Sequence, residues 1–277
     1  MKDKVKILEE KAHSIRNEVL DMCINAGTGH VTSCFSCVEI LVALYHGDIL
    51  QYDVNNLEWD ERDRFILSKG QASPLLYVVL ADLGFFPRDK LATFCQADGM
   101  FGVHLQNDVP GVEISSGSLG HGLGIAAGLA LRAKMDKKNY RVFTLLGDGE
   151  CHEGSMWESA MFASHHCLDN LIAIVDRNRL CVTSFTEDIV HLDPLNKKWE
   201  AFDWDVQVID GHSLEEILIH LNGNHSRTSK KPLMLIANTV KGKGVPSIEN
   251  KPLWHGLAPQ GDDAILAKKE LNEKEQQ

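Results

Sequence analysis

The sequence lacks several features that would place it in other classes of protein. No apolar run in its 277 residues is long enough to cross a membrane, and its N-terminus is charged and amphipathic, unlike a signal peptide. Positive charge is also scarce, because 28 Lys and Arg residues against 39 Asp and Glu residues give a net charge of −11. This balance disfavours nucleic acid and anionic membranes as partners. We therefore expect a cytoplasmic protein with no nucleic-acid or membrane partner.

The cysteines give no sign of a disulfide framework or a zinc site. There are seven of them, an odd number, scattered along the chain, which is typical of reduced thiols in a cytosolic protein. Cys34 and Cys37 form a Cys-x-x-Cys pair, but a redox or zinc role would need a thioredoxin-like context or a second pair, and neither is present. We interpret the pair as small residues at the start of a buried helix.

The remaining composition is that of a globular protein, with 44% hydrophobic and 24% charged residues. Without internal repeats or a clear linker, we expect one domain over residues 1–277. Short apolar runs predict strands at 65–67, 142–146, 171–175, 206–209 and 233–237. Helical spacing predicts helices at 5–24, 33–45, 117–134, 194–202 and 213–221. This alternation predicts an α/β fold, a mostly parallel sheet with helices on both faces, whose strand order cannot be read.

The stretch 141–180 organises the chain. Its first apolar run ends at Gly-Asp-Gly, 147–149, and a helical pattern follows Gly154. A second apolar run ends at Asp-Arg-Asn, 176–178. This is strand, loop, helix, strand and loop, one βαβ unit of a parallel sheet. Both polar loops follow the carboxyl ends of strands, the edge at which open α/β sheets bind ligands.

The chemistry of these two loops indicates a site for a metal and a diphosphate. Asp148 offers a carboxylate and Asn178 an amide oxygen, both hard ligands suited to Mg²⁺. Gly147 and Gly149 let the backbone approach a diphosphate closely, and the helix after Gly154 would direct its N-terminus towards the same anion. The alternative interpretation is a Rossmann-like loop with a capping aspartate and a turn asparagine.

A Gly-Asp-Gly turn followed about 30 residues later by Asn, across a βαβ unit, resembles the thiamine diphosphate signature. The surrounding residues resemble the transketolase family in particular. The resemblance implies thiamine diphosphate and Mg²⁺ as cofactors, with the metal bound by Asp148, Asn178 and the backbone carbonyl of Leu180. It also implies cofactor contacts from Gln71, Gly117, Leu119, Gly147, Asp148, Gly149, Glu150, Asn178 and His255.

Three loop histidines match positions at which transketolases hold sugar hydroxyls, move protons and contact the diphosphate. They are His30 after a Gly-x-Gly turn, His104 in the long loop 96–116, and His255 beside a tryptophan. Histidine suits proton transfer because its unperturbed pKa lies near neutrality. Taken singly, each is more often a surface or hydrogen-bonding histidine. Lys241 matches a family lysine near the mouth of the substrate site, and its alternative is a solvated loop lysine.

Two acidic residues, one just before and one within the predicted helix that follows Gly154, extend the resemblance. Glu153 and Glu158 match acidic residues that the family uses at its dimer interface, near the aminopyrimidine ring of the cofactor. We therefore include Glu153 among the candidate catalytic residues, with His30, His104 and His255.

The resemblance covers only the N-terminal, diphosphate-binding half of a full transketolase. The missing half carries the pyrimidine-binding domain and the glutamate that activates the cofactor. We therefore expect the partner to be a separate C-terminal subunit, in an α₂β₂ assembly. The complete enzyme would transfer a two-carbon ketol unit from a ketose or ketose phosphate donor to an aldose acceptor.

Three positions depart from the family pattern. Gln71 stands where the family has a histidine, and an amide cannot carry a proton. Val182 replaces a glutamine that some members place near the donor, and Leu105 replaces the proline after His104. Two alternatives therefore stay open. One is a specialised two-component enzyme that passes a glycolyl or similar unit to another acceptor, and the other is a non-catalytic transketolase-like protein.

Overall fold

The computed structural model of the chain describes residues 1–182, 184–222 and 228–273. Its main sheet has five strands in the order β1-β2-β3-β7-β6, and every neighbouring pair is parallel. The strands are β1 (Arg64–Leu67), β2 (Val142–Gly147), β3 (Leu171–Arg177), β6 (Asp205–Asp210) and β7 (Leu233–Asn238). All five predicted strands are confirmed, and so is the α/β fold class. The structure also gives the strand order, which could not be read from the sequence pattern.

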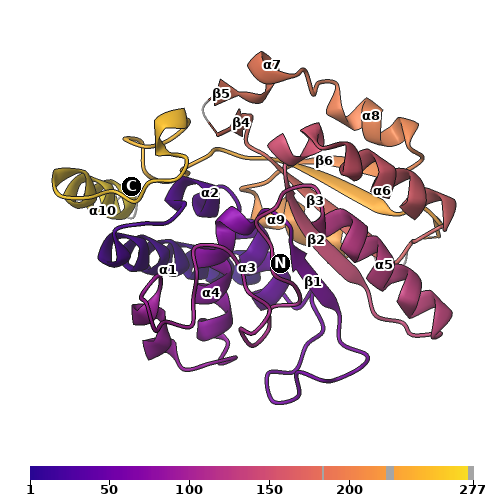
Figure 1. Ribbon diagram of the computed structural model, residues 1–277, viewed down its shortest axis with the longest axis horizontal. Coiled ribbons are helices and arrows are strands. Elements are labelled where there is room, and N and C mark those ends of the chain that lie inside the picture. Colours follow the sequence, from indigo (N-terminus) through magenta and orange to yellow (C-terminus); the bar gives the residue numbers. More distant parts are fainter. Residues whose placement is uncertain (183, 223–227, 274–277) are drawn as a thin grey trace.

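Helices cover both faces of the sheet (Figure 1). On one face lie α1 (Lys2–Ala26), α3 (Val38–His46), α4 (Ser73–Asp82) and α9 (Leu214–Asn222), packed into one apolar cluster. On the other lie α5 (Gly122–Met135), α6 (Gly154–His165) and α8 (Leu195–Ala201), packed into a second cluster. Successive strand residues alternate between the two, so Phe143 and Leu145 join the first cluster and Val142 and Leu146 the second. A parallel sheet buried on both faces explains the continuous apolar runs of the sequence.

Shorter elements complete the chain. They are the helices α2 (Val31–Phe35), α7 (Thr186–Ile189) and α10 (Asp262–Glu273), the strands β4 (Leu180–Cys181) and β5 (Ser184–Phe185), and the 3₁₀ turns Gly70–Ala72, Arg88–Thr93, Gly149–His152 and Pro252–Trp254. The C-terminal helix α10 lies beside α1 (Figure 1), where Ala267 and Leu271 join the first apolar cluster.

Three element predictions need correction. The helix predicted at 33–45 is two helices, α2 and α3, separated at Ser36 and Cys37, where the Cys37 backbone leaves the helical region with φ −125° and ψ 19°. The helix predicted from residue 117 begins at Gly122, since Gly117 has a φ of 139° and cannot be helical. Residues 180–189, to which the sequence patterns assigned no helix or strand, contain the β4–β5 hairpin and α7.

The predicted state of the cysteines is confirmed, because all seven are free thiols. Cys34 and Cys37 are fully buried at the junction of α2 and α3, and burial raises the pKa of the Cys37 thiol to about 12. A thiol with so high a pKa is a poor nucleophile at neutral pH, which fits the interpretation of the pair as core residues. Within the described ranges, no helix is both long enough and apolar enough to span a membrane.

Candidate functional site

One pocket lies at the carboxyl edge of the sheet, where β1, β2, β3 and β7 end. Most of the residues predicted to bind cofactor, metal or substrate line it: Gln71, Leu119, Gly147, Asp148, Gly149, Glu150, Asn178, Leu180, Lys241 and His255. Parallel strands bring these loops together, although they come from positions more than 180 residues apart in the sequence. Ser33, Lys69, Cys181 and Val182 also line the pocket.

Asp148 follows β2 and is almost completely buried. Its Oδ1 accepts a hydrogen bond from the Gly149 amide at 2.8 Å, and its Oδ2 accepts from the Arg179 amide at 2.6 Å and from Arg177 Nη1 at 3.1 Å. Burial, together with the nearby Asp176 carboxylate, raises the pKa of Asp148 to about 6. A buried carboxylate beside a second carboxylate is a favourable place for a cation.

Asn178 follows β3, the strand next to β2. Its Nδ2 donates to Asp176 Oδ2 at 3.3 Å, and its Oδ1 accepts from the Leu180 amide at 3.1 Å, so the orientation of the amide is fixed. The oxygens of Asp148, Asn178 and Leu180 form a hard donor set of the kind Mg²⁺ prefers. In the described part of the chain, no group of three or more His, Cys, Asp or Glu residues could hold a metal. Mg²⁺ fits such a site, because it needs only one or two protein ligands beside phosphate oxygens and water.

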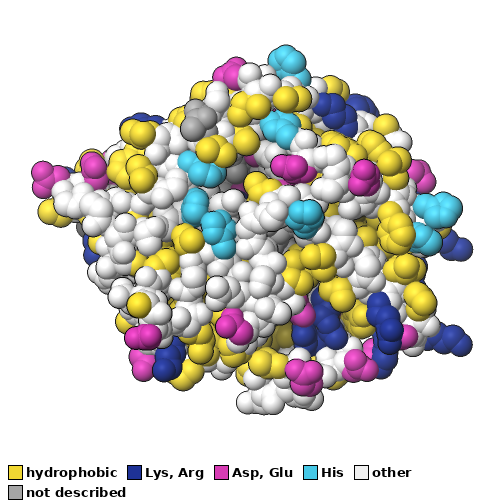
Figure 2. Space-filling view, in the orientation of Figure 1, with side chains coloured by type: hydrophobic (Ala, Val, Ile, Leu, Met, Phe, Trp, Pro, Cys, Tyr) yellow, Lys and Arg dark blue, Asp and Glu magenta, His cyan; other side chains and the backbone are white. Residues whose placement is uncertain are grey.

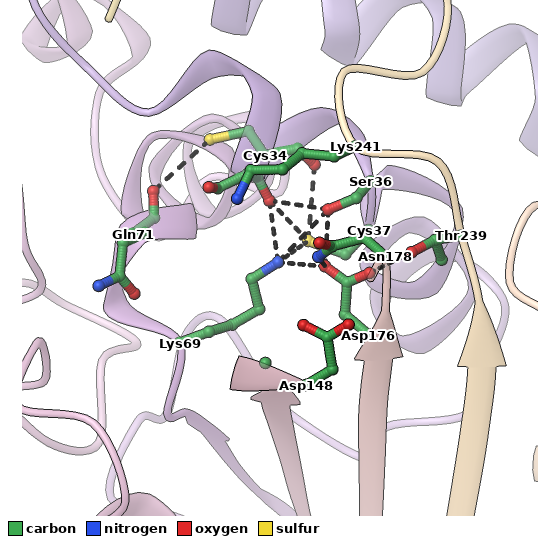
Figure 3. A network of polar contacts seen from close by, with 12 residues as sticks. Cys34, Ser36, Cys37, Lys69, Gln71, Asp148, Asp176, Asn178, Thr239 and Lys241 are labelled. Atoms are coloured by element: carbon green, nitrogen blue, oxygen red, sulfur yellow. Dashed lines mark hydrogen bonds and ion pairs between the residues drawn. The ribbon is translucent and has the colours of Figure 1, made fainter. Parts of the chain in front are cut away.

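A buried network behind the pocket was not predicted from the sequence (Figure 3). Lys69, directly after β1, donates to the Ser33 carbonyl at 3.0 Å and forms an ion pair with Asp176. Asp176 also accepts from the hydroxyls of Ser36 and Thr239. Burial by itself lowers the pKa of Lys69, but the Asp176 carboxylate outweighs it and holds that pKa above its usual value. The network joins the ends of β1, β3 and β7 behind the candidate metal ligands.

Arg177, the last residue of β3, was also missed. Its side chain is 1% exposed, and it donates to Asp148, to Thr186 Oγ1 at 2.7 Å and to Glu187 Oε1 at 2.6 Å. Glu187 in turn accepts a hydrogen bond from the Leu192 amide. Arg177 therefore connects the candidate metal ligand to the segment 186–193. The signal in the sequence was a charged residue inside an otherwise buried strand, since a buried charge requires partners.

Glu150 occupies the turn after Asp148 and is fully buried. Its carboxylate accepts the amides of Gly147 and Gly120, each at 2.9 Å, and the hydroxyl of Ser68. Burial raises the pKa of Glu150. Its oxygens thus hold together the ends of β1 and β2 and the turn before α5, so its contacts are structural ones around the pocket.

The three predicted histidines come together beside the pocket. The His30 ring lies 5.6 Å from the His104 ring and 5.5 Å from the His255 ring, measured between centroids. Figure 2 shows several histidine side chains gathered at the centre of this face. Gly117 lies against His104, since a Cβ on this glycine would be 2.8 Å from the imidazole. The absence of a side chain at Gly117 therefore leaves room for the His104 ring.

Lys241 is linked directly to this cluster. Its Nζ lies 2.9 Å from His255 Nδ1, and burial, helped by the charge of Lys69, lowers the pKa of Lys241 to about 8. Burial, together with Lys241, lowers the pKa of His255 to about 3. Burial, together with His104, lowers the pKa of His30 to about 4. Both imidazoles are therefore neutral at pH 7.

Glu153 and Glu158 do not line the pocket. Glu153 is the exposed residue before α6, packed against Gly120, and Glu158 is exposed on the same helix. Neither touches the histidine cluster or the metal ligands, so a catalytic role for Glu153 within this chain stays a prediction.

A titration followed by NMR tests the histidine environment. We expect the ring resonances of His30 and His255 not to titrate between pH 5 and 8, because their pKa values lie near 4 and 3. Since these values lie below the unfolded value of about 6.5, the unfolded chain binds more protons and stability falls as the pH drops below that value. His30→Asn and His255→Asn variants assign the signals. A midpoint near pH 6.5 for either ring would contradict the described burial.

A family model for the domain described as "Transketolase, thiamine diphosphate binding domain" matches residues 7–276. The chain is 38% identical over 270 residues to one subunit of the apulose-4-phosphate transketolase of Phocaeicola vulgatus, covering 98% of this chain and 95% of that protein. It is 40% identical over 251 residues to a 6-deoxy-6-sulfo-D-fructose transketolase subunit of a Clostridium species, covering 90% of each. The solved structure of Campylobacter jejuni transketolase superposes with a TM-score of 0.88 at 31% identity, covering 96% of this chain and 42% of that one.

These similarities extend over nearly the whole chain. The two curated relatives are of similar length and are both named as subunits, whereas the chain covers less than half of the one-chain transketolase of C. jejuni. The chain therefore belongs to the transketolase family, as a transketolase-type enzyme subunit that carries the thiamine diphosphate-binding domain.

Proposed function

We propose that the chain binds Mg²⁺ and the diphosphate of thiamine diphosphate in a cytoplasmic two-component transketolase. The enzyme transfers a two-carbon ketol unit from a ketose or ketose phosphate to an aldose. The observation that carries this proposal is the position of Asp148 and Asn178 in one pocket with His255, which contacts the neighbouring His30. This pocket combines ligands for a metal–diphosphate with groups that can move protons. In this proposal one domain over residues 1–277 supplies both the ligands and the groups that move protons.

In this proposal Asp148, Asn178 and the Leu180 carbonyl hold Mg²⁺. Gly147, Gly149, Leu119 and Gln71, which line the pocket, contact the cofactor, and Glu150 orients the turns that carry these contacts. Gly117, which lies against His104 and does not line the pocket, is proposed as a further contact. Bound thiamine diphosphate supplies the carbanion chemistry of ketol transfer. The residues of the protein bind and orient this cofactor and exchange protons around it.

The histidine cluster has defined proton positions. Lys241 Nζ donates to His255 Nδ1, so the neutral His255 ring carries its proton on Nε2 and can donate it to a diphosphate or a substrate oxygen. His30 Nδ1 is buried and has no hydrogen-bond partner among the described residues, which fits a ring that awaits a substrate hydroxyl. His104, in contact with His30, would complete proton exchange with the same hydroxyls.

The partner in this proposal is a C-terminal subunit with the pyrimidine-binding domain, in an α₂β₂ assembly. The P. vulgatus relative is named as one subunit of its enzyme, which supports the presence of a second one. So does an apolar surface on α5 and α6, where Ile125, Met161 and Phe162 are 39%, 53% and 41% exposed. Glu153 directly precedes α6 and Glu158 lies on this helix, where an assembled partner could bring both close to the aminopyrimidine.

Reconstitution tests the proposal. The chain is mixed with a pyrimidine-binding transketolase subunit from the same source, in thiamine diphosphate and Mg²⁺, and ketose formation from hydroxypyruvate and ribose 5-phosphate is measured. We expect turnover in the mixture and none with either chain alone. Failure of the mixture to bind cofactor, or ketose formation by this chain without a partner, would contradict the proposal.

A specialised acceptor is the second candidate. It is favoured by Gln71, which lines the pocket in place of the family histidine, and by the exposed Val182 at the same pocket. The names of two relatives, for apulose 4-phosphate and 6-deoxy-6-sulfo-D-fructose, indicate that the substrates of such subunits vary, which supports a substrate outside the pentose phosphates without separating donor from acceptor. In this case the mixture binds cofactor but turns over pentose phosphates slowly.

The variant Gln71→His tests how this residue sets the substrate range. We expect it to raise kcat/KM for xylulose 5-phosphate about tenfold in the assembled enzyme, because a positioned imidazole restores a proton-carrying group worth at least that factor. The control is Gln207→His, at an exposed position of β6 far from the pocket. An unchanged or lower kcat/KM in Gln71→His would show that position 71 does not limit this reaction.

A further inference from the structure

A second cavity lies near the amino end of β1, whereas the cofactor pocket lies at the carboxyl end. It has a volume of about 200 Å³ and is formed by residues 45–65, by Phe85 and by the tip of the loop after His104, residues 107–113. None of the residues that line it belongs to the cofactor pocket. The two cavities are therefore separate features of the fold.

Aromatic rings form much of the wall of this cavity. Tyr45 lies 5.7 Å from Tyr52 and 5.6 Å from Phe65, and Tyr52 lies 5.7 Å from Phe85, between ring centroids. Tyr45 is only 6% exposed, and the Tyr52 hydroxyl donates to its backbone carbonyl at 2.8 Å. Aromatic faces attract cations.

The charged residues around the cavity leave an excess of negative charge. Glu113 is paired with Arg62, and Asp63 with Arg141, so these two carboxylates are neutralised. Asp53, Glu58 and Asp108 also line the cavity, are exposed, and form no ion pair with the described residues. Aromatic walls under uncompensated carboxylates are complementary to an organic cation, because the rings bind its apolar groups and the acids its charge.

We propose that this cavity binds a small organic cation of the alkylammonium class. An inorganic cation would lack the apolar groups that pack against the aromatic walls, and an anion would face the three carboxylates. The volume suits a headgroup of a few carbon atoms around one nitrogen. This binding is separate from ketol transfer and does not depend on it.

The loop that closes the cavity also reaches the histidine cluster. Its two ends meet where the Ser116 amide donates to the Leu105 carbonyl at 3.2 Å. His104 and Gly117 lie immediately outside this junction. At the tip, Gly111 has a φ of 88°, and a Cβ there would be 2.6 Å from the Phe85 ring, so the tip packs closely on the aromatic wall. A ligand in the cavity would therefore contact a loop whose ends lie next to His104 in the sequence.

Binding of choline to the full chain is the test, measured by isothermal titration calorimetry at fixed ionic strength. The comparison ligand is 3,3-dimethyl-1-butanol, which has the same shape without the charge. We expect saturable binding of choline. The neutral compound should bind at least about tenfold more weakly, which is equivalent to ~1.4 kcal/mol. No saturable binding of choline, or equal binding of the two compounds, would overturn the proposal.

Paired variants locate the site. Glu58→Gln with Asp108→Asn removes two charges at the cavity and should weaken choline binding about tenfold. Glu9→Gln with Glu10→Gln removes two exposed charges from α1 and should leave it unchanged. Equal effects of the two double variants would mean that choline responds to net charge only, and would overturn the assignment of the cavity.

Coupling to the cofactor pocket has its own readout. Choline at saturation should shift the imidazole resonances of His104 but not those of His212, whose ring nitrogens are held by Glu39 and the Val240 amide and which does not line the cavity. A His104→Asn variant assigns the signal. Binding of choline without a shift at His104 would overturn the coupling through the loop.

Discussion

Replacing Asp148 with asparagine is expected to weaken Mg²⁺-dependent binding of thiamine diphosphate about 100-fold or more in the assembled enzyme. Loss of groups that merely orient a metal ligand costs roughly 10- to 100-fold in metal affinity, and loss of the only carboxylate ligand should cost at least as much. The amide keeps the size of the side chain. Arg177 keeps its partners Glu187 and Asp193, so the segment 186–193 stays anchored.

Calorimetric titration with thiamine diphosphate, with Mg²⁺ and again with EDTA, measures this effect. Asp188→Asn is the matched control, because Asp188 is an exposed carboxylate on α7 with no place in the pocket. A denaturation curve shows that both variants are folded. Cofactor affinity in Asp148→Asn equal to that of the control would remove Asp148 from the metal site.

The Lys69→Met variant is expected to lower the free energy of unfolding by about 3–5 kcal/mol. It removes the only cation bonded to Asp176 in the described structure and leaves a carboxylate buried without its partner. The ion pair holds the pKa of Asp176 below its usual value against the effect of burial. Since this pKa is depressed, the contribution of Asp176 is complete above the unfolded value of about 3.9 and is lost as the pH falls through the folded value.

Urea denaturation at pH 7 measures the loss. Lys197→Met is the control, because it breaks an exposed pair with Glu200, which should change stability by less than about 1 kcal/mol. The double variant Lys69→Met with Asp176→Leu should recover part of the loss, since no unpaired charge then remains buried. A Lys69→Met variant as stable as the control would show that the network does not support the fold.

The cofactor pocket could be predicted from the sequence because its signals are local. Gly147, Asp148 and Gly149 directly follow a buried strand, and Asn178 closely follows the next strand in the sequence. The carboxyl ends of neighbouring parallel strands must meet at one edge, so residue chemistry and strand direction were sufficient to place both side chains together.

The network behind the pocket could not be predicted, because its partners are distant in sequence. Lys69 and Asp176 are separated by 107 residues, and Ser36 and Asp176 by 140. No spacing rule connects such residues until the strand order is known. The same network includes Ser36 at the junction of α2 and α3, whose hydroxyl bonds an aspartate of the sheet.

A crystal structure of the assembled enzyme with thiamine diphosphate and Mg²⁺ would test the central claim most directly. It should show Mg²⁺ bound by Asp148, by the side-chain oxygen of Asn178 and by the Leu180 carbonyl, at roughly 2.0–2.1 Å, with diphosphate oxygens completing the octahedron. Metal and diphosphate at another edge of the sheet, or a metal that does not contact Asp148, would contradict it.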